Sequence, residues 1–374
     1  WNPNFLKSST RYSYQIYNIF EGIAGLPYVK FTNVSTPDDL YRTIAVPVTN
    51  ELHCSSTEFR YRDTYIVEYA NIQFENLGLL HNDENEFFLY DVGWYPFLKH
   101  DTDYLAPPLT KIYVETGIFL TPWTDNYYHW TAESISRLLL LQDQGFFKEH
   151  PDAKVFVSNH RFIKESLDAI GFPKENRVFF DGGKHQVVAD RLYAIINNPW
   201  GHLGAECMHH QMPPVRALRL MNQFFRSNVS GTSKKVIYIP RSGTVARATK
   251  FDDIFVPTMK EMLGDQFVLH DPSKPFLVQV EMFNNACLII GAHGAGLSNM
   301  IFSPPGTGII ELPAQEAHLH LFFSHIAAAL GMSYWSIPEI SSSYFSYYPS
   351  TQTTVDTLVN AVQDAMLHCC NRLK

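Results

Sequence analysis

The sequence predicts an α/β protein made of two domains around a hinge, with a cleft between them. The chain has 374 residues, more than an ordinary single domain holds, which suggests about two domains. Its second half alternates short β-rich runs with helical patterns, and its first half repeats this pattern less regularly. Between them lies a polar stretch, Ser227–Lys235, that is suited to a hinge.

The second half gives the clearest pattern. Each β-rich run is short and is followed by apolar residues at helical spacing. Such an alternation requires crossover connections, and therefore a parallel sheet that is covered on both faces. We expect a doubly wound domain from about residue 230, with strands at 236–240, 266–270, 287–290, 308–312 and 333–337, and helices at 255–263, 275–286, 295–302, 317–330 and 354–367.

The first half predicts a second α/β sheet. A long helix is expected over 126–145, where the middle, Leu138–Leu141, is strongly apolar. Residues 1–60 carry scattered turn signals and receive no assignment. The other elements expected in this half are strands at 64–74, 111–120, 153–157, 177–180 and 187–196, and helices at 162–170 and 214–227.

Composition and charge exclude several classes of protein. Apolar residues make up 45% of the chain and charged residues 18%, which is a globular composition and not a disordered one. The formal net charge is −8, so we expect no nucleic-acid partner, because such a protein would carry a basic face. No apolar stretch approaches the roughly 18–20 residues that a membrane helix needs. Since the chain begins at Trp1, we expect that a membrane anchor could lie upstream.

The cysteines would allow disulfides in an oxidising compartment. None of the five forms a CxxC pair, so a zinc ribbon or thioredoxin-type site is not expected. Cys287 lies in an apolar run and is expected to be a buried thiol. The other four could form up to two disulfides. Two N-x-S/T sequons, at Asn33 and Asn228, together with a chain that begins at Trp1, favour a lumenal or secreted setting.

A glycine-rich turn, Gly291–Gly296, follows a buried strand and opens a helix. Glycines let the backbone turn sharply and approach a ligand closely, and a helix start offers N–H groups and a positive dipole end to a phosphate. The spacing GxxGxG differs from the GxGxxG dinucleotide fingerprint, and the chain contains no GxxxxGK[ST]. The alternative is a tight strand–helix turn that packs against a neighbouring element.

Cations and a carboxylate follow other strands of the same sheet. Arg241, Arg247 and Lys250 come after the strand that ends at Pro240, and guanidinium groups suit a diphosphate. The alternative is a solvated loop. Glu311 ends the strand after the glycine turn, where it could accept hydrogen bonds from sugar hydroxyls or serve as an ordinary carboxylate at a strand end.

These segments resemble glycosyltransferase family 61. Residues Cys287–Pro313 read CLIIGAHGAGLSNMIFSPPGTGIIELP, which is similar to the family signature GxHGAxLxNxxFxxPGxxxxEL. The arginine loop from Tyr238 onward and Asn126–Trp130 also match family patterns, and the resemblance spans roughly residues 110–340. It implies two Rossmann-like domains facing a cleft, the GT-B architecture. We place an acceptor-side domain at 1–228 and a donor domain at 229–374, whose last helix could pack back on the first.

The resemblance also implies the reaction. Family members are inverting enzymes that transfer xylose, arabinose or N-acetylglucosamine from a UDP-sugar donor to a glycan or glycoprotein acceptor. They are regarded as metal-independent and use no cofactor, and eukaryotic members work in the lumen of the Golgi or endoplasmic reticulum. Arg241 would hold the UDP diphosphate with Arg247 and Lys250, and Glu311 would meet ribose or uracil. The turn would contribute His293, which lines the donor pocket, and the backbone N–H groups of Gly294, Ala295 and Gly296.

Inversion needs a general base, which we expect from the first domain. His129 and Glu133 are four residues apart at the start of the long helix and therefore share a face. We predict that His129 is the base, or positions the acceptor, and that Glu133 orients it. Asp125 is the competing base, although it could simply cap the helix. A buried, hydrogen-bonded histidine is the alternative for His129.

Acceptor contacts and metal ligands give weaker signals. Trp123, Asn126 and Trp130 could contact an acceptor sugar, and core packing is the alternative for the tryptophans. Asp101-Thr102-Asp103 spells a DxD triplet, but it precedes a proline pair in a loop, so we expect no metal site.

Two other functions compete with glycosyl transfer. One is a catalytically silent protein that binds a nucleotide or sugar on the same scaffold. The other is a UDP-sugar epimerase, which also uses paired Rossmann domains. Turnover with an acceptor distinguishes the transferase from both.

Overall fold

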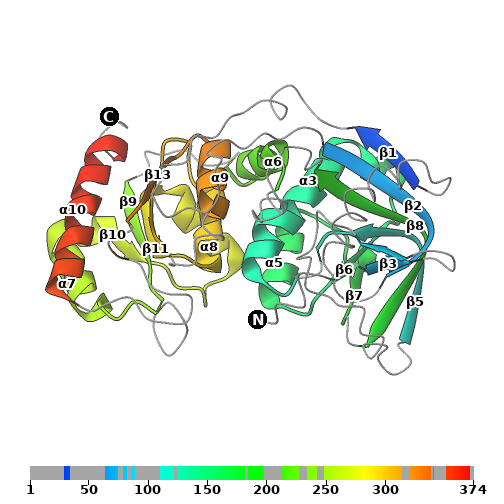
Figure 1. The fold of residues 1–374 in the computed structure, drawn as a ribbon, viewed down its shortest axis with the longest axis horizontal. Helices are drawn as coiled ribbons and strands as arrows, with labels where there is room; N and C mark the ends of the chain where they lie inside the picture. The colour runs from blue at the N-terminus through cyan, green and yellow to red at the C-terminus, as the bar shows by residue number, and fades with distance from the viewer. Residues whose placement is uncertain are drawn as a thin grey trace, which may run out of the picture. The chain divides into compact units, whose positions relative to one another are not determined.

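The chain folds into two α/β units (Figure 1). The described residues of the first unit end at Pro214, and those of the second begin at Val215. The computed structural model describes residues 29–33, 64–74, 79–81, 86–88, 110–121, 124–181, 184–197, 213–226, 234–241, 248–313, 321–337, 340 and 351–370.

The second unit contains an all-parallel sheet of five strands in the order β10-β9-β11-β12-β13. This confirms the doubly wound sheet that the alternating pattern predicts. The strands are β9 (Lys235–Ile239), β10 (Phe267–Leu269), β11 (Ala286–Ala292), β12 (Gly308–Leu312) and β13 (Ser333–Ser336). The helices are α6 (Val215–Arg226), α7 (Asp252–Leu263), η7 (Gly264–Gln266), α8 (Phe276–Asn284), η8 (Ala295–Phe302), α9 (Leu321–Ala329) and α10 (Gln352–Cys369).

Both faces of this sheet are covered, as a crossover topology requires. Leu288 and Ile290 belong to a core cluster that includes residues of α7 and α10, whereas Ile289, which points to the opposite face, is also completely buried. Figure 1 shows α7 and α10 on one side of the sheet and α8 and α9 on the other. Because α10 packs against its own sheet, it belongs to the core of the second unit.

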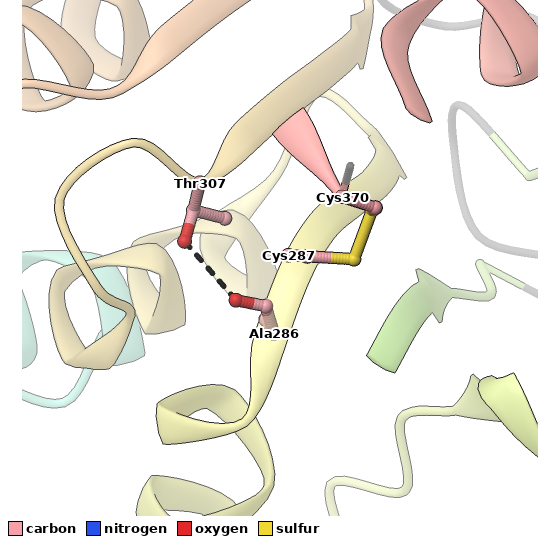
Figure 2. Close-up of a disulfide and its surroundings, with 4 residues drawn as sticks. All are labelled: Ala286, Cys287, Thr307 and Cys370. Atoms are coloured by element: carbon pink, nitrogen blue, oxygen red, sulfur yellow. Dashed lines mark hydrogen bonds between the residues drawn. A yellow bond between two sulfur atoms is a disulfide. The ribbon is translucent and has the colours of Figure 1, made fainter. Parts of the chain in front are cut away.

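A disulfide joins Cys287 of β11 to Cys370 just after α10 (Figure 2). The expectation that Cys287 is a buried thiol is therefore wrong, whereas the neighbouring Cys369 is buried and takes no part in this disulfide. An apolar run predicts burial but does not reveal that the last helix ends beside it. Beside the disulfide, the Thr307 hydroxyl donates to the carbonyl oxygen of Ala286 at 3.2 Å. Cys54 and Cys207 lie outside the described residues.

The first unit is built on a mixed sheet with the order β4-β3-β2-β8-β5-β6-β7, in which β1 also pairs with β2. Strands β8, β5, β6 and β7 run parallel, and β2 joins β8 antiparallel. The strands are β1 (Val29–Asn33), β2 (Thr64–Phe74), β3 (Leu79–His81), β4 (Glu86–Phe88), β5 (Thr110–Phe119), β6 (Lys154–Val157), β7 (Arg177–Phe179) and β8 (His185–Asn197). The helices are η4 (His129–Ile135), α3 (Ser136–Asp143), α4 (Phe146–Glu149), α5 (Arg161–Ala169) and η5 (Lys174–Asn176).

Two helical segments differ in type from a regular α-helix. The expected long helix begins as a π-helix, η4, before continuing as α3. Serine hydroxyls compete for its carbonyls: Ser134 donates to the carbonyl of His129 at 3.1 Å, and Ser136 to that of Ala132 at 2.5 Å. The segment after the glycine turn, η8, is a 3₁₀-helix. Both differences arise from local hydrogen bonding, which apolar spacing does not report.

Helix α6 belongs to the second unit, although the boundary was expected after it, at 228. The side-chain amide of Asn222 donates to the carbonyls of Ile301 at 2.6 Å and Ser303 at 2.8 Å. In the other direction, the Asn284 amide donates to the carbonyl of Phe225 at 3.1 Å. These buried bonds attach α6 to η8 and α8. Among the described residues, no helix is long and apolar enough to cross a membrane.

We predict that reduction destabilises the second unit. The disulfide closes a sequence separation of 83 residues, and loops of this order typically give about 2–4 kcal/mol of stability. Dithiothreitol should therefore lower the free energy of unfolding of the wild type by that amount in urea titrations. The Cys369→Ala control should respond equally. A Cys287→Ala/Cys370→Ala variant should not respond, and a full response there would contradict the pairing.

Candidate functional site

The carboxyl ends of β9 and β11 bring the arginine loop and the glycine turn together. Nη1 of Arg241 donates to the carbonyl oxygen of His293 at 2.9 Å. The loop behind Arg241 is anchored at Thr249, whose backbone N–H donates to the carbonyl of Arg241 at 2.9 Å. A cation therefore lies at the edge of an all-parallel sheet where ligands of such folds usually bind.

The glycines of the turn provide space for this arrangement. A Cβ atom on Gly294 would lie 2.0 Å from Nη1 of Arg241, so a side chain there would displace the guanidinium. A Cβ atom on Gly296 would lie 3.0 Å from Cγ2 of Ile239 in β9. Gly294 has φ 166°, which is extended backbone, so its role is close approach and not a left-handed turn.

Behind the turn, His293 belongs to a buried hydrogen-bonded chain. Its Nδ1 lies 2.5 Å from Oε1 of Glu311, and the hydroxyl of Tyr334 donates to Oε2 of Glu311 at 2.5 Å. Glu311 is completely buried and His293 is 7% exposed. The expected contact of Glu311 with ribose or uracil stays a prediction, since both of its oxygens contact protein groups here.

Of the two other cations expected at the donor site, the structure describes only Lys250. Lys250 is exposed in the turn that precedes α7. Arg247 lies outside the described residues. Ala295 begins η8, and its carbonyl accepts a hydrogen bond from the Ser298 hydroxyl at 2.7 Å. Phosphate binding by the amides of residues 294–296 therefore remains a prediction.

In the first unit, the structure brings His129 and Glu133 together. Nδ1 of His129 lies 2.9 Å from Oε2 of Glu133, with side-chain exposures of 15% and 4%. The pair lies on the π-helix η4, a helix type that often occurs at functional sites. The second carboxylate oxygen of Glu133 is buried and makes no hydrogen bond to a described residue. A partly exposed imidazole is thus held by a buried carboxylate.

The residues around this pair differ in their surroundings. Asp125 is exposed, and the side chain that caps the helix start belongs to Asn126, whose Oδ1 accepts from the Tyr128 amide at 2.9 Å. Trp130 is completely buried, and its indole N–H donates to Ser166 at 2.8 Å. Trp130 therefore packs in the core, which was the alternative to a contact with an acceptor sugar. Trp123 lies outside the described residues.

Two features of these sites were not predicted. Tyr334 contacts Glu311 from β13, and only the register between β12 and β13 reveals this contact. Close to η4, the half-exposed rings of Tyr127 and Phe162 pack edge to face at 5.2 Å, and His160 stacks on Phe162 at 5.4 Å. The aromatic residues of both segments are visible in the sequence, but their proximity depends on the tertiary fold.

A comparison with known protein families gave a match that covers the middle of the chain. Residues 127–310 match the family model described as Glycosyltransferase 61. The matched range begins beside His129 and Glu133 and includes Arg241 and the glycine turn. A comparison with curated proteins gave no match. The two α/β units, each of which contains parallel strands, agree with the GT-B class of fold, and residues 127–310 of the chain belong to glycosyltransferase family 61.

Proposed function

We propose that this glycosyltransferase is an inverting enzyme that takes its sugar from a UDP-sugar. The sugar would be of the xylose, arabinose or N-acetylglucosamine class, and the acceptor a hydroxyl of a glycan or glycoprotein. The observation that carries the proposal is the guanidinium of Arg241 lying across the glycine turn at the carboxyl edge of a parallel sheet. A planar cation beside backbone amides suits a diphosphate.

The pair in η4 supports a base for this reaction. Since Nδ1 of His129 contacts Glu133, Nε2 is the ring nitrogen that would receive the acceptor proton. In the proposed step, the acceptor oxygen attacks the anomeric carbon as its proton passes to His129. The bond from that carbon to UDP breaks, and its electron pair leaves with UDP. A single displacement of this kind inverts the anomeric configuration.

Stabilisation of the departing diphosphate is the second requirement. Negative charge grows on UDP as the bond breaks, and preorganised donors reduce the barrier most where charge develops. Arg241 is suited to this role because its position is already set by the carbonyl of His293. We propose that no metal ion takes part. An oxidising compartment such as the Golgi or endoplasmic reticulum lumen is supported by the Cys287–Cys370 disulfide.

Nucleotide selectivity tests the donor class. We predict that UDP and one or more UDP-sugars raise the melting temperature, whereas GDP and CMP compounds do not, and that EDTA leaves the shift unchanged. A ligand at 100 times its dissociation constant stabilises the folded state by about 2.7 kcal/mol. Scanning fluorimetry measures this. A shift that EDTA abolishes would contradict the metal-independent step, and the absence of any shift would favour a function without nucleotide.

Gly294→Ala tests the placement of Arg241. The added methyl group displaces the guanidinium, a flexible end, so we predict little loss of stability but roughly tenfold or more weaker binding of UDP. Calorimetric titration measures the affinity. Because both changes act through one guanidinium, Gly294→Ala should add little in an Arg241→Ala background. Fully additive effects would show that Gly294 acts independently of Arg241.

The kinetics of His129 and Glu133 variants test whether His129 is the general base. We predict that His129→Ala lowers kcat for sugar transfer by about 10²–10⁴-fold, with UDP affinity unchanged. Glu133→Gln keeps the shape of the side chain but removes its charge, and should reduce kcat less. UDP release in the presence of glycan acceptors measures both. The exposed His368 of α10 supplies the control, His368→Ala, and a His129→Ala enzyme as fast as this control would remove His129 from the mechanism.

A further inference from the structure

A continuous chain of side chains runs from β13 to the glycine turn. The Tyr334 hydroxyl hydrogen-bonds to Ser336 and donates to Oε2 of Glu311, and Oε1 of Glu311 contacts Nδ1 of His293. Tyr334 itself is half-buried, with its hydroxyl against the completely buried Glu311. A buried carboxylate is costly unless its oxygens are hydrogen-bonded, and here each oxygen has a partner.

We propose that Glu311 and Tyr334 are positioning residues that lock the ring of His293 with a proton on Nδ1, so that His293 meets the donor through Nε2. The lock follows from the contacts of the second unit alone. Its purpose, to present Nε2 to the diphosphate of a nucleotide donor, rests on the proposed function.

The direction of each hydrogen bond follows from the chemistry of the groups. Burial, together with the neighbouring Glu311 carboxylate, raises the pKa of Tyr334 well above its usual value, so the phenol keeps its proton and donates. An ionised Glu311 can only accept. The bond to His293 therefore requires a proton on Nδ1, in the neutral ring as well as in the charged one.

This arrangement gives His293 a defined role beside Arg241. Its backbone carbonyl accepts from Arg241, and its ring is held from behind by Glu311. Phe323 packs edge to face against the ring at 5.3 Å and limits its rotation. When the ring is protonated, the carboxylate stabilises the charge and Nε2 can donate to a phosphate oxygen. Arg241 and His293 would then both bind the leaving group.

Replacing Glu311 by glutamine should change the tautomer of the neutral His293 ring, so that its proton moves from Nδ1 to Nε2. Because the Tyr334 hydroxyl donates to Oε2 of Glu311, we expect it to retain the amide oxygen of the new side chain, so that the amide NH₂ group faces Nδ1 of His293. The neutral ring must therefore accept at Nδ1 and carry its proton on Nε2. Nitrogen NMR of protein labelled with ¹⁵N-histidine reports this state across a pH series, and the His293 signals are assigned by their loss in His293→Gln.

The expected spectra are specific. In the wild type, Nδ1 of His293 should be protonated at every pH at which the fold persists, whereas in Glu311→Gln it should lose its proton when the ring becomes neutral. An unprotonated Nδ1 in the wild type would contradict the proposal that Glu311 holds the His293 ring with a proton on Nδ1. An Nδ1 that stays protonated across the pH series in Glu311→Gln would contradict it as well. Thermal unfolding of each variant confirms that the spectra come from folded protein.

Tyr334 is tested by removing its hydroxyl. In the Tyr334→Phe/Glu311→Gln variant nothing holds the amide oxygen on the tyrosine side, so the glutamine can turn and protonation of Nδ1 should partly return. Tyr238→Phe/Glu311→Gln is the matched control, because Tyr238 is a buried tyrosine of the same sheet that donates to a different carboxylate, Asp252. If both double variants keep the ring state of Glu311→Gln, Tyr334 does not position Glu311.

Titration with UDP separates this inference from the proposed function. We expect Glu311→Gln to weaken UDP binding by roughly tenfold, and Tyr238→Phe to leave it unchanged. If the wild type shows the predicted ring state but does not bind UDP, the lock stands and the proposed donor is wrong. If the wild type binds UDP, and Glu311→Gln removes the proton from Nδ1 of His293 without changing the affinity for UDP, then His293 does not contact the donor in the proposed way.

Discussion

The approach of Arg241 to the glycine turn is the contact on which the rest of the donor-side account depends. The guanidinium reaches the carbonyl of His293 only because residue 294 has no side chain. Strands β9 and β11 are neighbours in a parallel sheet, so their carboxyl ends bring these two loops together. The fold thus places a cation beside backbone amides, an arrangement that would reduce the reorganisation needed in the proposed reaction.

A second constraint is the burial of charge behind the same turn. Glu311 lies at the end of β12 with no exposed surface, and the groups around it supply two hydrogen bonds. His129 and Glu133 repeat this logic in the first unit, where a buried carboxylate orients a partly exposed imidazole. In both places a buried carboxylate contacts Nδ1 of a histidine. In the proposed function, both histidines would depend on the ionisation and orientation of this carboxylate.

Much of this organisation can be predicted from the sequence, for identifiable reasons. The all-parallel sheet follows from the alternation of strands and helices, and the His129–Glu133 contact follows from helical spacing, which is close enough even in a π-helix. Contacts that depend on register or on distant packing could not be predicted. Tyr334 reaches Glu311 through the pairing of β12 and β13, Cys370 reaches Cys287 through the docking of α10, and Trp130 is buried by its contact with α5.

The central claim is that Arg241 and the glycine turn form the binding site for a nucleotide diphosphate. A crystal structure of the protein with bound UDP tests it most directly. The account predicts diphosphate oxygens within hydrogen-bonding distance of the Arg241 guanidinium and the backbone amides of residues 294–296, with Nε2 of His293 facing them and Glu311 still bonded to Nδ1. A diphosphate bound elsewhere, with the turn unoccupied, would contradict the account.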